Sequence, residues 1–159
     1  MNLFDPQLDL TFERIVEIPK ELVWRAWTEP SHIVHWFTPA PWKTVACEID
    51  LRPGGRFHTV MQSPEGQSFP NTGCYLEVVK NRRLVWSNAV SPGFRPAAVP
   101  EGDFAMTAII ELADHAAGTR YTATVLHENS AARAQHAAMH FEEGWGKALD
   151  QLVALVKTW

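Results

Sequence analysis

The sequence predicts one α+β domain over residues 1–159, in which a bent antiparallel sheet of about seven strands wraps around a long C-terminal helix. Three observations predict this class. Strand-like alternation recurs from residue 42 to 127, a long amphipathic segment follows from about residue 130, and no repeat or linker divides the chain. A bent sheet that closes on one helix buries the apolar faces of all these elements in a single core.

The first part of the chain is predicted to form a strand and two short helices. Residues 8–14 alternate apolar and polar side chains, as is typical of a half-buried strand. Pro19 stands where a first helix over residues 20–27 can begin. Pro30 separates this helix from a second one over residues 31–36, because the residue before a proline disfavours helical backbone.

Six further strands are predicted before the C-terminal helix. Each combines alternating apolar side chains with turn residues such as Gly, Pro, Asn or Ser near its ends. Their approximate ranges are 45–51, 57–61, 72–80, 84–88, 106–112 and 121–127.

The C-terminal segment from about residue 130 to 157 is predicted to be one long amphipathic helix, with Ser130 as its N-cap. With about 100° between successive residues, side chains within about 40° of one line form its apolar face. These are Ala138, Phe141, Trp145, Leu149, Leu152 and Val156. We expect this face to pack on the sheet, with space for a cavity along the seam.

Two histidines in this helix stand at a spacing that can bind a metal ion. His136 and His140 are four residues apart, with Glu143 nearby. In a continuous helix they lie on the face opposite Trp145, together with Lys147. This is the face expected to contact solvent. We therefore expect both histidines to be exposed, and we predict no metal site.

Composition and charge exclude several classes of protein. The apolar share of 46% and the charged share of 20% are ordinary for a folded soluble protein. A net charge of −4 argues against nucleic-acid binding, which needs clustered Lys and Arg. No apolar run approaches the ~20 residues of a membrane span, and residues 1–10 show no secretory signal. Cys47 and Cys74 lack metal-finger spacing, so we expect reduced thiols and a cytoplasmic location.

Several segments, spread in order over nearly the whole chain, resemble one known family. They are residues 23–30 (VWRAWTEP), 36–39 (WFTP), 50–57 (DLRPGGRF), 75–78 (YLEV), 83–86 (RLVW), 118–120 (GTR) and 144–152 (GWGKALDQL). They resemble the activator of Hsp90 ATPase homologue 1-like (AHSA1-like) family of the START/Bet v 1-like helix-grip superfamily. The resemblance implies a helix-grip fold with an internal ligand cavity between sheet and C-terminal helix. It leaves the activity open, because the superfamily includes lipid carriers, hormone receptors and polyketide cyclases.

The resemblance and the aromatic side chains together predict a protein that binds an apolar or amphipathic small molecule in this cavity. Seven tryptophans are more than a solid core needs. We expect ligand contacts from residues that face the seam between sheet and helix, namely Phe57, Met61, Trp86, Met106, Ile110, Tyr121, His127, Phe141 and Trp145. No catalytic motif or phosphate-binding glycine loop is present, and we predict no cofactor.

Two other functions stay open. One is an enzyme of the polyketide cyclase/aromatase type, in which His127 or Tyr121 moves protons. The other is a module that interacts with a chaperone or another protein, and a homodimer is compatible with either. For His127 the structural interpretation, a hydrogen bond to a neighbouring carbonyl, stands beside the functional one.

Two local questions are also open. Glu77 is expected on the same strand face as Tyr75, either solvated or buried against an arginine, with Arg14, Arg56 and Arg120 as candidates. The segment 91–103 holds three prolines and two glycines, so we expect a loop outside the sheet. Its apolar Phe94 and Val99 either cover the cavity mouth or belong to a passive surface loop.

Overall fold

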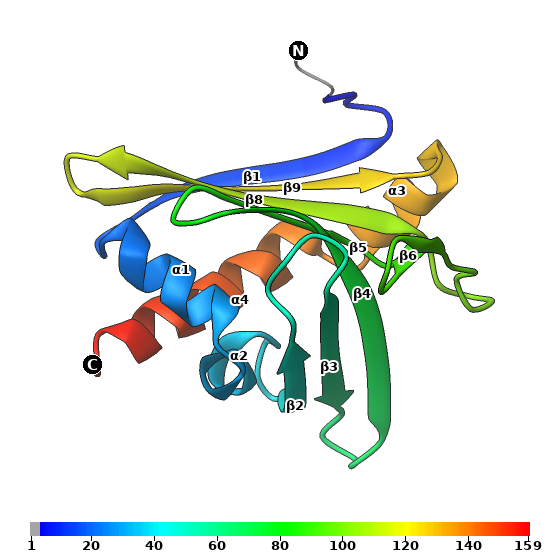
Figure 1. Cartoon of the computed structure of the whole chain (residues 1–159), viewed down its shortest axis with the longest axis horizontal. Coiled ribbons are helices and arrows are strands. Elements are labelled where there is room, and N and C mark those ends of the chain that lie inside the picture. The colour runs from blue at the N-terminus through cyan, green and yellow to red at the C-terminus, as the bar shows by residue number, and fades with distance from the viewer. Residues whose placement is uncertain (1–3) are drawn as a thin grey trace.

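The computed structural model describes residues 4–159 as a bent antiparallel sheet with helices on one side (Figure 1). The strand order in the main sheet is β1-β9-β8-β5-β4-β3-β2. The strands are β1 (Asp9–Val16), β2 (Lys43–Ile49), β3 (Arg56–Gln62), β4 (Ser68–Val79), β5 (Arg83–Ser87), β8 (Met106–His115) and β9 (Gly118–His127). The α+β class and the sheet of about seven strands are thereby confirmed.

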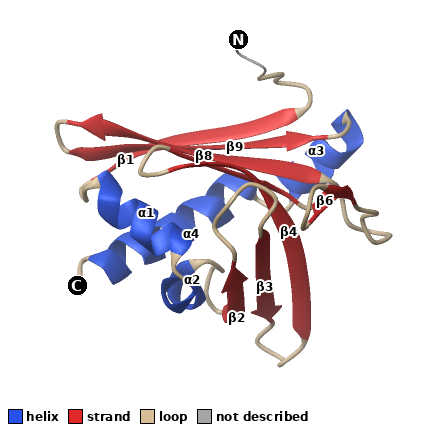
Figure 2. Ribbon diagram, viewed as in Figure 1, coloured by secondary structure: helices blue, strands red, loops and turns tan. Residues whose placement is uncertain are grey.

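The helices are α1 (Lys20–Thr28), α2 (Pro30–Trp36), α3 (Ser130–Ala138) and α4 (Phe141–Val156). Figure 2 shows α1, α2 and α4 on the same side of the sheet, with β2, β3 and β4 turned steeply away from β1, β8 and β9. The core lies between this bent sheet and the helices, where Val23, Ile33, Leu84, Ile110, Leu149 and Leu152 are almost fully buried. None of the helices in residues 4–159 combines the length and apolar character that crossing a bilayer requires.

A β-bulge in β4 places Tyr75 and Glu77 on opposite faces of the sheet, although they were expected to share one face. The register passes from Tyr75 opposite Trp86 directly to Glu77 opposite Val85, so Leu76 is an extra residue in β4. Tyr75 therefore faces the core and Glu77 faces the outer surface. Strict alternation had placed both side chains on one face, and that expectation is wrong because one extra residue shifts the phase of a strand.

The C-terminal helix is interrupted, which corrects the prediction of one continuous helix. α3 ends at Ala138, and His140 adopts a left-handed conformation (φ 59°, ψ 54°) before α4 begins. This break rotates α3 relative to the wheel of a straight helix. His136 is consequently buried and Ala138 is exposed, the reverse of the expectation, whereas His140 and Lys147 are exposed as expected.

The proline-rich segment lies outside the main sheet, as its composition predicts. It contains a small two-stranded ribbon of its own, in which β6 (Val90–Ser91) pairs with β7 (Arg95–Pro96). Phe94 lies at the tip of this ribbon and is 54% exposed. The coverage of an interior cavity by this segment stays a prediction.

Candidate ligand-binding site

A cluster of aromatic rings fills the inner face of the sheet where it meets α1 and α2. The ring of Phe57 in β3 stacks on that of Tyr75 in β4, with 5.4 Å between the ring centroids. It meets the ring of Trp86 in β5 edge-on, with 5.2 Å between the centroids. Trp27 of α1 contacts Trp86 at 5.2 Å, and Phe37 after α2 contacts Phe57 at 5.6 Å. The period of two in the strands and the apolar faces of the helices direct these rings toward one another.

The hydroxyl group of Tyr75 is the unusual polar atom of this cluster. Tyr75 is fully buried, and within residues 4–159 its Oη is the buried side-chain polar atom that has no hydrogen-bond partner. Burial, followed by the nearby Cys47, raises the pKa of Tyr75 well above its usual range, so the hydroxyl stays protonated. It is a neutral donor without an acceptor, in surroundings that are otherwise apolar.

Tyr121 provides a direct contrast to Tyr75. It is also buried, but its Oη accepts a hydrogen bond from Nε1 of Trp27 at 3.2 Å. Burial raises the pKa of Tyr121 well above its usual range, although the bond from Trp27 opposes the shift. This hydroxyl therefore takes part in a hydrogen bond within the fold. It stays protonated near neutral pH and cannot act as a general base there.

Cys47 is unsuited to nucleophilic chemistry in this environment. Burial, and then the charge of Glu48, raises the pKa of its thiol to about 11. Because the thiolate is the reactive form, Cys47 is inert near neutral pH. Cys47 and Cys74 are free thiols, of which Cys74 is buried and Cys47 is partly buried.

A second polar feature lies at the other end of the inner face, where two buried histidines form a pair. Nε2 of His127, at the end of β9, lies 2.9 Å from Nδ1 of His136 in α3. Nδ1 of His127 lies 2.7 Å from the carbonyl oxygen of Leu8. Each ring is only 7% exposed, and Phe104 and Phe141 pack on His136 at 4.8 and 5.2 Å.

The carbonyl of Leu8 determines the tautomers of the neutral pair. A carbonyl oxygen can only accept, so Nδ1 of His127 carries the proton and its Nε2 accepts from Nδ1–H of His136. The remaining nitrogen of His136, Nε2, is then an unprotonated acceptor. Burial, and then His127, lowers the pKa of His136 from 6.5 to about 4, so this ring is neutral at pH 7.

The structure places all nine expected ligand-contacting side chains in buried or partly buried positions. Phe57, Trp86, Ile110, Tyr121, His127 and Phe141 are buried, whereas Met61, Met106 and Trp145 are partly buried. Six of them form two groups. Phe57 and Trp86 belong to the aromatic cluster, whereas Phe141, Trp145 and Met106, the register partner of His127, surround the histidine pair.

Met61 lies apart from both groups, toward the sheet edge. Its register partner on β4 is Phe69, whose ring contacts that of Trp42 in a tilted arrangement with 5.6 Å between the centroids. Both of these rings are exposed, at 42% for Phe69 and 37% for Trp42.

Sequence reasoning missed Tyr75 and His136 as site residues. The bulge at Leu76 concealed the inward orientation of Tyr75, and no pattern in the sequence marks it. The break at His140 concealed His136, and no Gly or Pro signals that break. The sequence offered one indirect signal for His136. His127 was expected to face inward, and a buried histidine needs a hydrogen-bond partner such as His136.

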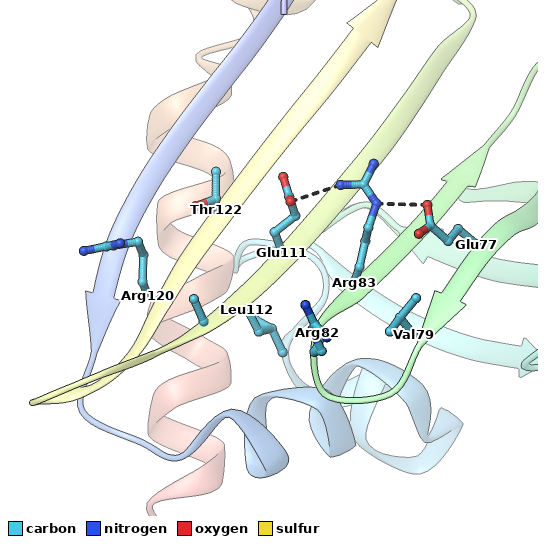
Figure 3. Close-up of a pocket in the computed structure, with 9 residues that line it drawn as sticks. Glu77, Val79, Arg82, Arg83, Glu111, Leu112, Arg120 and Thr122 are labelled. Atoms are coloured by element: carbon cyan, nitrogen blue, oxygen red, sulfur yellow. Dashed lines mark hydrogen bonds and ion pairs between the residues drawn. The ribbon is translucent and has the colours of Figure 1, made fainter. Parts of the chain in front are cut away.

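A hollow of about 570 Å³ lies on the outer face of the sheet, and Figure 3 shows the side chains that line it. At its centre the guanidinium of Arg83 donates to Glu77 at 2.9 Å and forms an ion pair with Glu111 at 3.0 Å. Its charge is thus compensated, and both carboxylates are about half exposed. Glu77 is therefore solvated, with Arg83 as its partner rather than any of the three arginines considered from the sequence.

Fold and inner face together define a helix-grip protein of the START/Bet v 1-like type, in which a bent sheet faces a C-terminal helix. The chain belongs to the family described as activator of Hsp90 ATPase homolog 1-like protein, whose match covers residues 17–157. The resemblance inferred from the sequence is thereby confirmed. Among curated proteins, no relative matches this chain.

Solved structures of similar proteins agree with this assignment. A crystal structure of a protein from Nitrosomonas europaea shares 48% identity over 98% of this chain and 97% of its own, with a TM-score of 0.92. A solution structure of an AHSA1-like protein from Aeromonas hydrophila shares 26% identity over 95% of this chain and 93% of its own, with a TM-score of 0.71. A protein from Rhodobacter sphaeroides, 21% identical over 96% of this chain and 95% of its own, has the same fold with a TM-score of 0.83.

Proposed function

We propose that this protein binds a small apolar or amphipathic molecule between the sheet and the helices, beside Tyr75, without covalent catalysis. The observation that carries the proposal is the buried, unpartnered hydroxyl of Tyr75 among aromatic rings. A buried hydroxyl without a partner costs about 1–3 kcal/mol. An acceptor on a bound molecule would remove this cost, and the rings around it would contact the apolar remainder.

The charges of the inner face favour an uncharged ligand. Arg14 is the inward cation of β1, and its guanidinium already pairs with Asp150 at 2.6 Å. A carboxylate beside Tyr75 would therefore lose its hydration without gaining a free cation, which is unfavourable. The expected ligand carries a carbonyl, ether or hydroxyl oxygen on an apolar or aromatic body. The proposed setting is the cytoplasm, which the two free thiols support.

Two fluorescent probes test the proposal. Prodan carries a carbonyl acceptor, and diphenylhexatriene is a hydrocarbon without one. We expect saturable binding of both, with Tyr75→Phe weakening prodan at least fivefold and leaving diphenylhexatriene unchanged. Tyr121→Phe is the matched control, because its hydroxyl is already bonded to Trp27. The absence of saturable binding, or an equal loss for both probes in Tyr75→Phe, would refute the proposal.

The histidine pair favours a second candidate, an enzyme of the cyclase/aromatase type. Nε2 of His136 is the acceptor that acid–base chemistry would use, in place of Tyr121. Incubation of the protein with a linear aromatic polyketide distinguishes the two functions. Recovery of the compound unchanged supports binding alone. Conversion by the wild-type protein and not by His136→Asn supports the enzyme.

A further inference from the structure

The histidine pair joins three segments that are distant in sequence. Through its two nitrogens His127 connects Leu8, which precedes β1, to His136 of α3. Phe104, from the segment before β8, packs on both imidazole rings at 5.7 and 4.8 Å. Figure 1 shows α3 at the end of β9.

α3 has few other attachments to the core. Of its nine residues only Ala132 and His136 are buried. Within residues 4–159 its other side-chain hydrogen bonds to distant segments run from Arg133 to the carbonyl of Asp9 at 3.2 Å and from Gln135 to the carbonyl of Gly102 at 2.8 Å. The bond between His136 and His127 is thus the buried polar connection of this helix.

The hydrogen bond between the rings survives one proton but not two. In the neutral pair Nδ1–H of His136 donates to Nε2 of His127. With one proton added, His127 donates through both nitrogens, and His136 accepts as its Nε2–H tautomer. With two protons, N–H groups oppose each other across 2.9 Å, and two cations are buried side by side.

No carboxylate is placed to stabilise the doubly protonated pair. The charged side chains closest in sequence to the two rings and to the residues that contact them include Asp9, Asp103, Glu128, Arg133, Glu142 and Glu143, and His140 is a further titratable group there. Within residues 4–159 none of them forms a hydrogen bond or ion pair with either ring. Burial and the neighbouring ring together lower the pKa of His136 to about 4.

We propose that the His127–His136 pair is a proton-operated latch, which holds α3 on the sheet when it carries at most one proton and releases α3 when it carries two. Release would detach α3 while α4 remains packed on the sheet through Leu149 and Leu152. This inference does not require a ligand. Its extension, that release opens the interior to a small molecule, rests on the proposed function.

Amide hydrogen exchange, expressed as protection factors at pH 7, 5.5 and 4, tests the latch. In the wild-type protein we expect α3 amides to lose at least tenfold protection between pH 5.5 and 4, while the amides of Leu149 and Leu152 stay more strongly protected than those of α3 at every pH. In His136→Asn the amide NH₂ replaces Nδ1–H and cannot titrate, so α3 should keep its protection. His140→Asn is the matched control and should behave as wild type, because His140 is exposed and asparagine tolerates its left-handed backbone.

A second measurement keeps the test valid if His136→Asn does not fold. Imidazole ¹⁵N shifts of the wild-type protein should show Nδ1–H tautomers for both rings at pH 7, and the titration of His136 should coincide with the loss of α3 protection. The latch proposal would be overturned if His136 titrated near pH 6.5. It would also be overturned if the α3 amides lost the same amount of protection in the wild-type protein and in His136→Asn. Prodan affinity that stays constant through α3 release would refute only the gating extension.

Discussion

The ring of Phe94 lies directly over the backbone of Gly54, in the turn between β2 and β3. A Cβ at residue 54 would lie 2.8 Å from Cε2 of Phe94, and Gly54 has a φ of +83°. Next to this contact the amide of Gly93 donates to the carbonyl of Gly54 at 2.8 Å. The proline-rich segment is thus attached to this turn by one ring and one hydrogen bond.

Phe94→Ala is expected to loosen this attachment without destabilising the fold. Exchange of the Gly93 amide should accelerate at least fivefold, because the ring no longer shields its bond to Gly54. The free energy of unfolding should change by less than about 1 kcal/mol, since the ring is largely exposed. Phe69→Ala, which removes another exposed ring, should leave the Gly93 amide unaffected. Unchanged exchange in Phe94→Ala would contradict the prediction.

The two glycines of α4 should respond differently to alanine. Nothing lies within 4 Å of a Cβ at Gly144, so Gly144→Ala should stabilise the protein by about 1 kcal/mol through helix propensity. At Gly146 a Cβ would collide with Nη2 of Arg14, and the ion pair with Asp150 would have to shift. Gly146→Ala should therefore gain less in urea unfolding. In an Arg14→Ala background the two substitutions should stabilise the protein equally. Equal gains at both glycines while Arg14 is present would show that Arg14 is no obstacle.

The two buried tyrosines should give opposite changes when each loses its hydroxyl. Tyr75→Phe removes an unpartnered polar atom and should raise the free energy of unfolding by about 1–3 kcal/mol in the absence of ligand. Tyr121→Phe leaves Nε1–H of Trp27 buried without an acceptor and should lower it by about 1–3 kcal/mol. Urea unfolding of both variants measures the difference. A loss of stability in Tyr75→Phe would mean that its hydroxyl has a partner.

Acid should destabilise the protein through His136. Its pKa is about 4 in the folded protein and 6.5 in the unfolded chain, so the unfolded chain binds the proton first as the pH falls. This contribution to stability is complete above pH 6.5, decreases between 6.5 and 4, and amounts to up to about 3 kcal/mol. The slope of stability against pH in this window should be smaller in His136→Asn than in His140→Asn. Identical slopes would argue against the pKa shift.

Local patterns in the sequence were sufficient for the strands, for α1 and α2, and for the family. A period of two describes β8 and β9 because each has one face in the core, and Pro19 and Pro30 mark helix boundaries because proline restricts the backbone locally. The buried face of α4, with Phe141, Leu149 and Leu152, follows its 3.6-residue period for the same reason.

Only the tertiary structure decided which polar groups enter the interior. One extra residue at Leu76 directs Tyr75 inward, and one left-handed residue at His140 directs His136 toward His127. Each changes the phase of its element, yet neither is required by nearby residues. The orientation of each element is determined by contacts between distant segments, such as Phe57 on Tyr75 and Phe104 on His136. A local sequence pattern does not contain these contacts.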